Sequence, residues 1–293
     1  MRILVLGKNG QLGTCLFDQF KGISNEVIFM SRSEIDLCDM NVSKIKILKI
    51  NPQIIINASA YTEVDKAENE EQEANKVNHL AVSKIAAICL QIDCWFIHIS
   101  TDYVFDGYAL EPYKETDITN PKGVYGKSKL NGEKEIIASS CKYIIIRTSW
   151  IFSEYGKNFM KTMLELGNTH KEISVVADQF GCPTYAQDIA KAIVSLVGHI
   201  QTTNLRSSIY HFSGDEICSW HQFATTIFLD AKKFRYKTPD KVKSISTDEY
   251  PTLAKRPIYS VLNTSKLENE LGIGPSNWRK SIKDVLKALN TQN

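Results

Sequence analysis

The chain lacks the features that would mark a membrane, secreted or nucleic-acid-binding protein. No apolar run approaches the roughly 20 residues needed to span a bilayer, and Met1 leads straight into a short core strand at residues 2–6, with no room for a secretory signal. Lys and Arg together number 35 against 33 for Asp and Glu, so the net charge of +2 provides no broad field for binding nucleic acid. We therefore expect a cytoplasmic protein with no membrane or nucleic-acid partner.

The chain also lacks the cysteine and histidine spacings of metal sites and redox motifs. Its seven cysteines include no CxxC pair, and an odd number scattered in this way does not suggest a disulfide framework. His79, His211 and His221 do not have the spacing of zinc ligands. We expect reduced, mostly buried thiols and no bound metal, and the sequence leaves open whether Mg²⁺ assists assembly.

Short apolar runs alternate with helical patterns in the first half of the chain. Hydrophobic residues make up 43% and charged residues 23% of the 293 residues, which is ordinary for a globular protein with a large core. The runs are rich in Ile, Val, Leu or Phe and lack strict alternation, as expected for parallel strands buried on both faces. Strands are predicted at residues 2–6, 26–30, 53–57, 95–100 and 143–147, with helices at 10–21, 42–50, 65–91 and 124–139.

The pattern becomes less regular after Trp150. Helical patterns follow at residues 158–166, 187–197, 219–229 and 282–289, with Ser219 as the expected cap of the third, and strand patterns at 173–176 and 207–212. The alternation of the first half predicts an α/β fold with a doubly wound parallel sheet. We expect this domain to span residues 1–152 and a smaller region to span 153–293, with the helix near 187–200 as a candidate to return to the first domain.

A glycine-rich segment, GKNGQLG at residues 7–13, follows the first predicted strand and opens the first predicted helix. Gly7, Gly10 and Gly13 let the backbone turn sharply and approach a pyrophosphate, and the start of the helix presents unpaired N–H groups to it. The segment predicts an NAD(P)-binding domain of the Rossmann type. The alternative is a tight strand-to-helix turn without a ligand.

The residues at the end of the second predicted strand favour NADPH over NADH. The sequence leaves the choice between the two cofactors open. The carboxylate that binds the adenosine ribose of NADH is expected about 20 residues beyond the glycines, where this chain has Ser31 and Arg32. Both side chains are able to bond a 2′-phosphate, although Arg32 as a solvated loop charge is the alternative. Asp39 and Met40 would flank the adenine. Ala58 and Ala60 follow the third strand. Their small side chains leave space for a cofactor, and close helix packing is the alternative explanation.

Three side chains have the spacing of a proton-transfer site. Thr101 follows the apolar run 95–100, at the edge where an open α/β sheet binds ligands, with Ser100 as its substitute if the register differs. Tyr125 and Lys129 are four residues apart and share a helix face. A ketone that receives hydride becomes an alkoxide, which needs a proton donor and a hydrogen bond at its oxygen.

We predict that Tyr125 is this donor, that Lys129 lowers the pKa of its phenol, and that Thr101 binds the carbonyl. Tyr and Lys at this spacing also occur on ordinary solvated helices, so the prediction depends on the Thr and the glycine segment that precede them. His98, in the middle of a strand, is expected to be structural.

Eight segments in a fixed order carry a resemblance to a known family. They are GKNGQLG (7–13), NASAYTEVDKAE (57–68), STDYVFDG (100–107), YGKSKLNGE (125–133), RTSW (147–150), NF (158–159), DQFGCPT (178–184) and RP (256–257). On these residues the chain resembles the dTDP-4-dehydrorhamnose reductase family, a branch of the extended short-chain dehydrogenases, nearly from end to end.

The resemblance implies NADPH-dependent reduction of the C4 ketone of dTDP-4-dehydro-β-L-rhamnose, a dTDP-4-keto-6-deoxy-L-sugar, to dTDP-L-rhamnose for cell-surface polysaccharide. It implies that Thr101, Tyr125 and Lys129 are the catalytic residues. The implied cofactor contacts are Gly7, Gly10, Gln11, Leu12, Asp39, Met40, Ala58 and Ala60, and the implied substrate contacts are Thr62, Val64, Asp102, Tyr103 and Trp150.

Two of the substrate contacts have structural alternatives. Arg256 is a candidate for the diphosphate because a guanidinium matches phosphate geometry, and a surface salt bridge is the alternative. The ring of Trp150 is able to stack on a sugar or a base, and core packing is the alternative.

Other functions on the same scaffold stay open. A 4,6-dehydratase needs an Asp-Glu pair after the Thr, whereas this chain has Asp102 and Tyr103. An epimerase with bound NAD is harder to exclude, and so is a regulatory subunit similar to the β subunit of methionine adenosyltransferase. The sequence decides neither the configuration at C4 of the product, which leaves 6-deoxytalose open, nor whether the protein is a homodimer.

Overall fold

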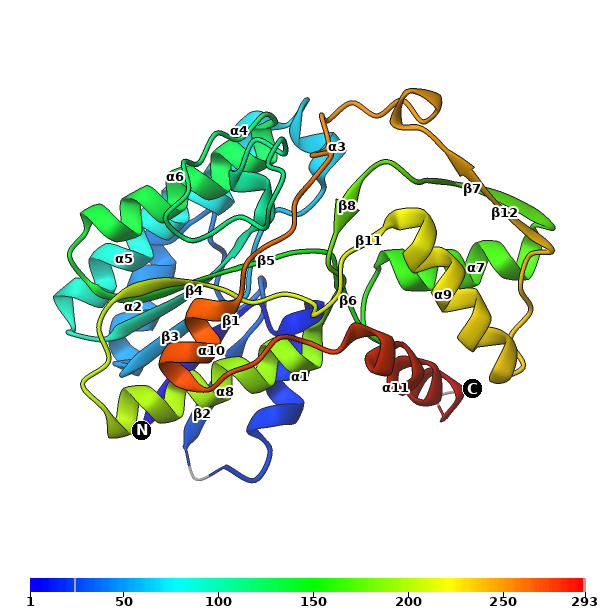
Figure 1. Ribbon diagram of the computed structural model, residues 1–293. Helices are drawn as coiled ribbons and strands as arrows, with labels where there is room; N and C mark the ends of the chain where they lie inside the picture. The colour runs from blue at the N-terminus through cyan, green and yellow to red at the C-terminus, as the bar shows by residue number, and fades with distance from the viewer. Residues whose placement is uncertain (24, 292–293) are drawn as a thin grey trace.

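The computed structural model describes residues 1–23 and 25–291, and its central element is a six-stranded parallel sheet (Figure 1). In chain order its strands are β1 (Arg2–Leu6), β2 (Glu26–Met30), β3 (Ile54–Asn57), β4 (Trp95–Thr101), β5 (Lys142–Thr148) and β10 (Ser208–His211). Across the sheet the order is β10-β5-β4-β3-β1-β2, and every pair is parallel. The order reverses between β1 and β3, which is the point where such sheets bind ligands.

Helices cover both faces of the sheet, which agrees with the largely apolar sequences of its central strands (Figure 1). One face packs against α1 (Gln11–Phe20) and α8 (Ala186–Thr202), which also contact each other. The other packs against α2 (Met40–Ile50), α5 (Ala81–Gln91) and α6 (Val124–Ala138). The predicted doubly wound parallel sheet is confirmed, and the five strands predicted for the first half agree with the structure within one residue at each end.

The single helix predicted at residues 65–91 is wrong, because the structure breaks it into four elements. These are α3 (Val64–Ala67), α4 (Glu71–Asn75), a π-helical turn η1 (Lys76–Leu80) and α5. Asn78, buried in the π-helical turn, accepts from the Tyr61 N–H at 2.9 Å and donates to the Ser128 hydroxyl at 3.1 Å. This contact ties the turn to α6, and an extra residue per turn is the usual way for a helix to accommodate such a constraint.

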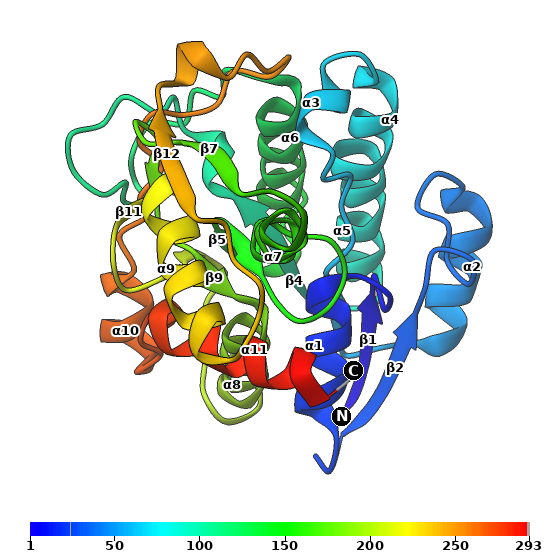
Figure 2. The ribbon, with the colours of Figure 1, turned by 90° about the vertical axis from the view of Figure 1, so that its right-hand side faces the viewer.

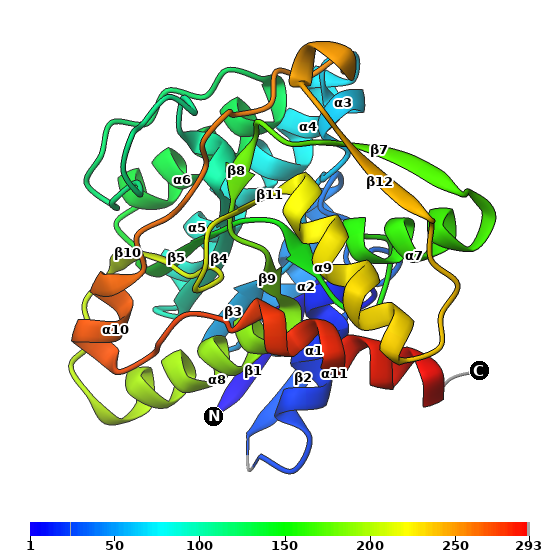
Figure 3. The same ribbon diagram turned by 45° about the vertical axis from the view of Figure 1, so that its right-hand side comes forward.

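The remaining elements form a second layer of structure beside the sheet (Figure 3). Its core is largely aromatic and includes Phe152, Phe223 and Trp278. Its helices are α7 (Phe159–Thr169), α9 (Trp220–Lys233) and α11 (Trp278–Thr291), with α10 (Ser265–Leu271) against β10. Its strands are β6 (Ile151–Phe152), β7 (Glu172–Val176), β8 (Phe180–Gly181), β9 (Thr184–Tyr185), β11 (Cys218–Ser219) and β12 (Lys241–Ile245), and short 3-10 turns lie at η2 (Asp102–Val104) and η3 (Thr247–Glu249).

After Trp150 the sequence pattern predicted the helices better than it predicted the strands. Ser219 caps α9 in a capping box with Gln222, as the Ser before the helical pattern predicted. The two-residue strands have no periodicity to read, and β12 (Lys241–Ile245), which pairs in parallel with β7, is mostly exposed. Figure 2 shows β12 and β7 far from α2, on opposite sides of the molecule. Over the described chain, every helix is too short or too polar to cross a membrane.

Candidate active site

A cleft of about 670 Å³ lies at the carboxyl ends of β1, β3 and β4. The glycine segment and residues 58–63 line one part of it. Ser100, Tyr125 and Lys129 line the deeper part, and Gly156 and Lys157 approach from the second layer. The cleft therefore brings together segments that the sequence assigned to cofactor binding and to proton transfer.

The glycine segment has the geometry of a dinucleotide-binding loop. Gly7 has a positive φ of 91°, and its N–H donates to the Met30 carbonyl at 3.0 Å. A Cβ on Gly13 would clash with the Gly7 carbonyl oxygen, so only glycine fits there. Gly10 caps α1 without a side-chain hydrogen bond, which leaves the first N–H groups of the helix available to an anion. These residues fit a dinucleotide pyrophosphate.

Gln11 and Leu12 line the cleft, and contacts within the protein hold their side chains. Gln11 accepts hydrogen bonds from the Ser153 hydroxyl and the Asn158 amide, each at 2.9 Å, and so joins α1 to the segment before α7. Leu12 is buried in the core below the sheet. Both residues are placed to meet a cofactor with their backbone N–H groups, while Ala58 and Ala60 line the cleft as expected.

Beside the end of the cleft that Arg32 lines, the sequence interpretation missed the carboxylate of Glu34. The Ser31 hydroxyl donates to Glu34 at 2.7 Å, and the Ser31 N–H donates to the same carboxylate at 2.8 Å. Ser31 is therefore engaged with Glu34, and its predicted bond to a 2′-phosphate is not supported. Arg32 lines the cleft with 81% of its side chain exposed, 3.9 Å from Asp36. Arg32 is thus the cation that this end of the cleft presents.

Asp39 has a structural explanation that the sequence did not consider. Its carboxylate accepts from the N–H groups of Asn41 and Val42 and caps α2. A carboxylate at the start of a helix stabilises the helix without any ligand. Met40 is the first residue of α2, and its side chain lies outside the described part of the structure.

The structure brings the three predicted catalytic residues together. Thr101 ends β4, Tyr125 lies in the first turn of α6, and Lys129 follows one turn later on the same face. The Thr101 hydroxyl lies close enough to the Tyr125 phenol to influence its pKa. Thr101 also donates to Asp102 at 3.0 Å, and its hydroxyl oxygen accepts from the Tyr103 N–H at 3.2 Å, which fixes its orientation.

Lys129 does not lower the pKa of Tyr125 as the sequence predicted. Burial raises the pKa of the Tyr125 phenol above its usual range, and the nearby Asp102 raises it further, while the neighbouring Thr101 hydroxyl opposes both. Burial also lowers the pKa of Lys129 to about 8, with Glu133 opposing that shift. The Lys129 amino group instead donates to the Ile99 carbonyl at the end of β4.

Asp102, a predicted substrate contact, is only 2% exposed. Burial raises the pKa of its carboxyl to about 6, and hydrogen bonds including that from Thr101 work against the shift. Tyr103 lies nearer to the reacting groups, because its ring meets that of Tyr125 edge to face at 5.6 Å. The structure therefore places Asp102 behind Thr101 and Tyr103 beside Tyr125.

In the structure Arg256 forms a salt bridge and Trp150 packs against another ring, which are the alternatives to substrate contact given by the sequence. The Arg256 guanidinium donates to Asp65 at 2.7 Å, so its charge is already paired and the predicted diphosphate contact is not supported. Trp150 stacks on Trp220 with ring centroids 3.4 Å apart. Of the other two predicted substrate contacts, Thr62 is exposed at the cleft, and Val64 is half-buried at the start of α3.

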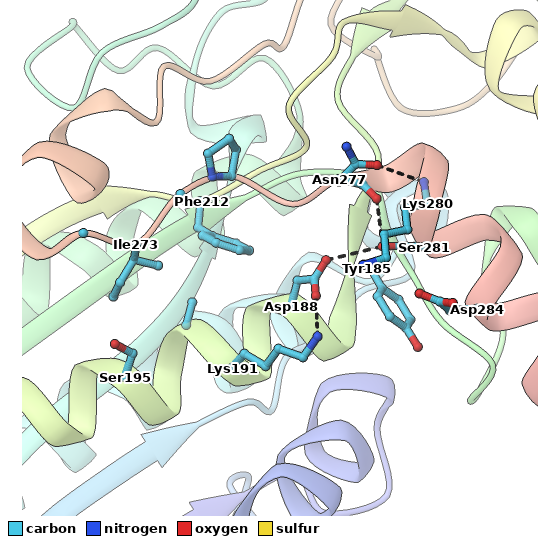
Figure 4. A pocket seen from close by; sticks show the side chains of 14 residues that line it. Tyr185, Asp188, Lys191, Ser195, Phe212, Ile273, Asn277, Lys280, Ser281 and Asp284 are labelled. Atoms are coloured by element: carbon cyan, nitrogen blue, oxygen red, sulfur yellow. Dashed lines mark hydrogen bonds and ion pairs between the residues drawn. The ribbon is translucent and has the colours of Figure 1, made fainter.

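A second concavity of about 420 Å³ lies between α8 and the segment leading into α11 (Figure 4). Its polar side chains are largely bonded to one another. Asp188 pairs with Lys191 at 3.0 Å and accepts from Ser281 at 3.4 Å. It lacks the combination of glycine loop and buried titratable groups that marks the cleft.

The cleft and the doubly wound sheet together are typical of the extended short-chain dehydrogenases and reductases. A comparison with protein families matches residues 1–291 to the RmlD substrate binding domain. The chain is 43% identical over 288 residues to a dTDP-4-dehydrorhamnose reductase of Aggregatibacter actinomycetemcomitans, covering 97% of this chain and 98% of that one. The chain belongs to the dTDP-4-dehydrorhamnose reductase family.

Solved structures of the same family superpose closely. A dTDP-4-dehydrorhamnose reductase from Clostridium acetobutylicum has a TM-score of 0.92 and 38% identity, over 99% of this chain and all of that one. Another from Bacillus anthracis, solved in complex with NADP, has a TM-score of 0.89 and 34% identity, over 100% of this chain and 99% of that one.

Proposed function

We propose that this protein is a cytoplasmic reductase that transfers hydride from NADPH to the C4 ketone of dTDP-4-dehydro-β-L-rhamnose, giving dTDP-L-rhamnose. The observation that carries the proposal is that Tyr125, with Thr101 beside it, and Lys129 line a cleft that also contains the glycine loop. The relatives named as dTDP-4-dehydrorhamnose reductases supply the substrate class. Seven free thiols, most of them buried, support a reducing compartment.

The proton that the reaction consumes comes from Tyr125 in this proposal. Its raised pKa keeps the phenol protonated at neutral pH, so it is a donor and not a base when the ketone arrives. The Thr101 hydroxyl donates to Asp102 in the structure and would turn its proton to the developing alkoxide, while the Tyr103 N–H still holds its oxygen. The bound NADPH supplies the hydride.

The cofactor is NADPH in this proposal because Arg32 is the exposed cation at the adenosine end of the cleft. The NADP complex of the Bacillus anthracis relative supports the same choice. Gly7, Gly10 and Gly13 would hold the pyrophosphate through the start of α1, with Ala58 and Ala60 leaving room beside it.

The sugar nucleotide would lie between the cleft and the second layer of structure. Tyr103, beside Tyr125, and Thr62, exposed at the cleft, are the contacts that the geometry supports best. We propose that residues 153–293 are mainly the substrate-binding region. The exceptions are β10, which is a strand of the sheet, and α8, which covers the sheet beside α1.

Turnover with a defined substrate tests the proposal. The purified chain is mixed with the dTDP-4-keto-L-sugar and NADPH or NADH, the loss of reduced nicotinamide is followed by absorbance, and the product is identified by NMR. Consumption of NADPH with formation of dTDP-L-rhamnose is expected. Inversion of the sugar by protein purified with tightly bound NAD, without added NADPH, would indicate an epimerase. No turnover together with tight binding to a partner enzyme would indicate a regulatory subunit.

A further inference from the structure

Lys129 carries a buried amino group that has no acidic partner at bonding distance among the described residues. Its side chain is 2% exposed. Its Nζ contacts the Ile99 carbonyl and lies 3.3 Å from Nε2 of His98. Glu133, one turn away on α6, is already paired with Arg147 at 2.7 Å. The nearest titratable contact of Lys129 is therefore a histidine, which is unusual for a charged lysine.

His98 belongs to a chain of hydrogen bonds that begins at a backbone amide. The Ser59 N–H donates to Oδ1 of Asn57 at 3.1 Å. Nδ2 of Asn57 lies 3.2 Å from Nδ1 of His98. Asn57 and His98 are partners in the register of β3 and β4, and both are at most 1% exposed, so no bulk solvent competes for these groups.

The donor and the acceptor of each hydrogen bond in this series follow from the first bond, which Ser59 donates to Asn57. A backbone N–H can only donate, so the Asn57 atom that faces Ser59 must be the carbonyl oxygen. The amide nitrogen of Asn57 then faces His98 and, because it can only donate, Nδ1 of the imidazole must accept. A neutral imidazole that accepts at Nδ1 carries its proton on Nε2. That N–H points at Nζ of Lys129.

An ammonium group cannot accept this bond, because it has three N–H groups and no lone pair. If Lys129 were charged, two donors would face each other at 3.3 Å in a buried site, and neither would be satisfied. An uncharged amine resolves the conflict, since its lone pair accepts from His98 while its own hydrogens donate to the Ile99 carbonyl.

We propose that His98 is a positioning residue for Lys129 and that, in the free protein, its Nε2–H donates to the uncharged amine of Lys129 and so favours that form over the ammonium. The inference rests on contacts within the chain, so it does not depend on the identity of the sugar substrate. It assigns to the histidine an effect on the reacting groups beyond the structural role expected from its mid-strand place.

The other groups that face Lys129 do not reverse the assignment. From α6, Glu133 favours the charged form, but Arg147 neutralises it. From β4 and the start of α6, Ser100 and the protonated Tyr125 line the same part of the cleft and carry no charge. Burial lowers the pKa of Lys129 to about 8 and holds that of His98 well below its usual range. His98 is therefore neutral at neutral pH, and the amine of Lys129 becomes uncharged as the pH rises past about 8.

The tautomer of His98 gives the first test and needs no variant in order to be decisive. Protein labelled with ¹⁵N-histidine, without cofactor, is studied by long-range ¹H–¹⁵N NMR, which distinguishes protons on Nδ1 and Nε2. The His98 signals are assigned among the six histidines by connecting each ring to its backbone resonances in the unaltered protein. A neutral ring with its proton on Nε2 is expected through the neutral pH range. A proton on Nδ1, or a cationic ring, would overturn the proposal.

The charge of Lys129 gives the second test. The ¹³Cε signal of Lys129, assigned by its absence in Lys129→Met, is titrated in the unliganded protein. We expect its midpoint near pH 8, below that of the exposed lysines. His98→Gln can keep an N–H donor close to the place of Nε2, whereas His98→Asn keeps the bond to Asn57 but is too short to reach Lys129.

The two variants are therefore a matched pair. The midpoint in His98→Asn is expected to rise by about one pH unit, the scale of one hydrogen bond, while that in His98→Gln stays near the original value. Equal midpoints in the unaltered protein and in folded His98→Asn would refute the role of His98. If either variant fails to fold, the tautomer of the unaltered protein still decides the matter.

Discussion

The carboxylate of Glu133 on α6 pairs with the guanidinium of Arg147 on β5 at 2.7 Å, with side chains only 1% and 3% exposed. Three hydrogen bonds from Arg147 to Glu133 make the contact bidentate. The pair joins the helix that carries Tyr125 and Lys129 to the strand beside Thr101. The pair therefore fixes the position of α6 relative to the sheet.

Removing one partner of this buried pair is expected to be strongly destabilising. Glu133→Gln leaves the Arg147 charge without its counter-ion and should lower the free energy of unfolding by about 3–5 kcal/mol, measured by urea denaturation. Asp93→Asn, in the exposed pair with Lys142, is the control and should cost less than about 1 kcal/mol. A similar small loss for both variants would contradict the structural role of the buried pair.

Tyr125→Phe is expected to retain NADPH binding and to lose most of its turnover. The change removes only the hydroxyl that would donate the proton, and general acid catalysis is typically worth about 10²–10⁴-fold in rate. Cofactor affinity is measured by fluorescence titration and kcat by NADPH oxidation. Tyr250→Phe, at an exposed tyrosine, serves as the control. Turnover close to that of the unaltered enzyme would remove Tyr125 from the mechanism.

Arg32→Ala is expected to weaken NADPH more than NADH. Loss of a charge-assisted bond to the 2′-phosphate should raise KM for NADPH by about 10- to 100-fold and leave KM for NADH nearly unchanged. Arg235→Ala, at an exposed arginine beyond α9, tests for a general effect of charge. Equal changes with both nicotinamides would show that Arg32 does not read the 2′-phosphate.

Asp102→Asn is expected to stabilise the protein at neutral pH but not in acid. Burial raises the pKa of this carboxyl to about 6 in the folded state, so the folded state holds the proton more tightly than the unfolded chain does. Stability from this group is therefore present below about pH 4 and is lost as the pH rises through about 6.

The amide mimics the protonated carboxyl and removes that dependence. The variant should match the unaltered protein near pH 4 and exceed its free energy of unfolding by about 3 kcal/mol near pH 8, measured by denaturation at both values. A variant that is less stable at the higher pH would show that Asp102 is held as a charged group.

Much of the candidate site was open to prediction because its residues lie close together in sequence. The glycine segment follows directly on β1, and Tyr125 and Lys129 are neighbours on one turn of helix, so local spacing was enough to place them. The Ser31–Glu34 bond was also local, but it depends on a turn geometry that residue types alone do not specify.

Contacts between distant segments were beyond the sequence. Arg256 and Asp65 are 191 positions apart, and nothing in either segment indicates that they pair. The same holds for Asn57, His98 and Lys129, whose chain of bonds depends on the register of β3 and β4 and on how α6 lies over them.

By itself the sequence determined the buried strands, the glycine loop, the cap of α9 and the family. These depend on periodic burial and on the backbone preferences of single residues, which act over a few positions. Only the tertiary structure decided the π-helical turn at η1, the pairing of Arg256 and the partner of Lys129. Each of these is set by which buried polar groups face one another, and in a low-dielectric interior such groups must find partners wherever the fold brings them.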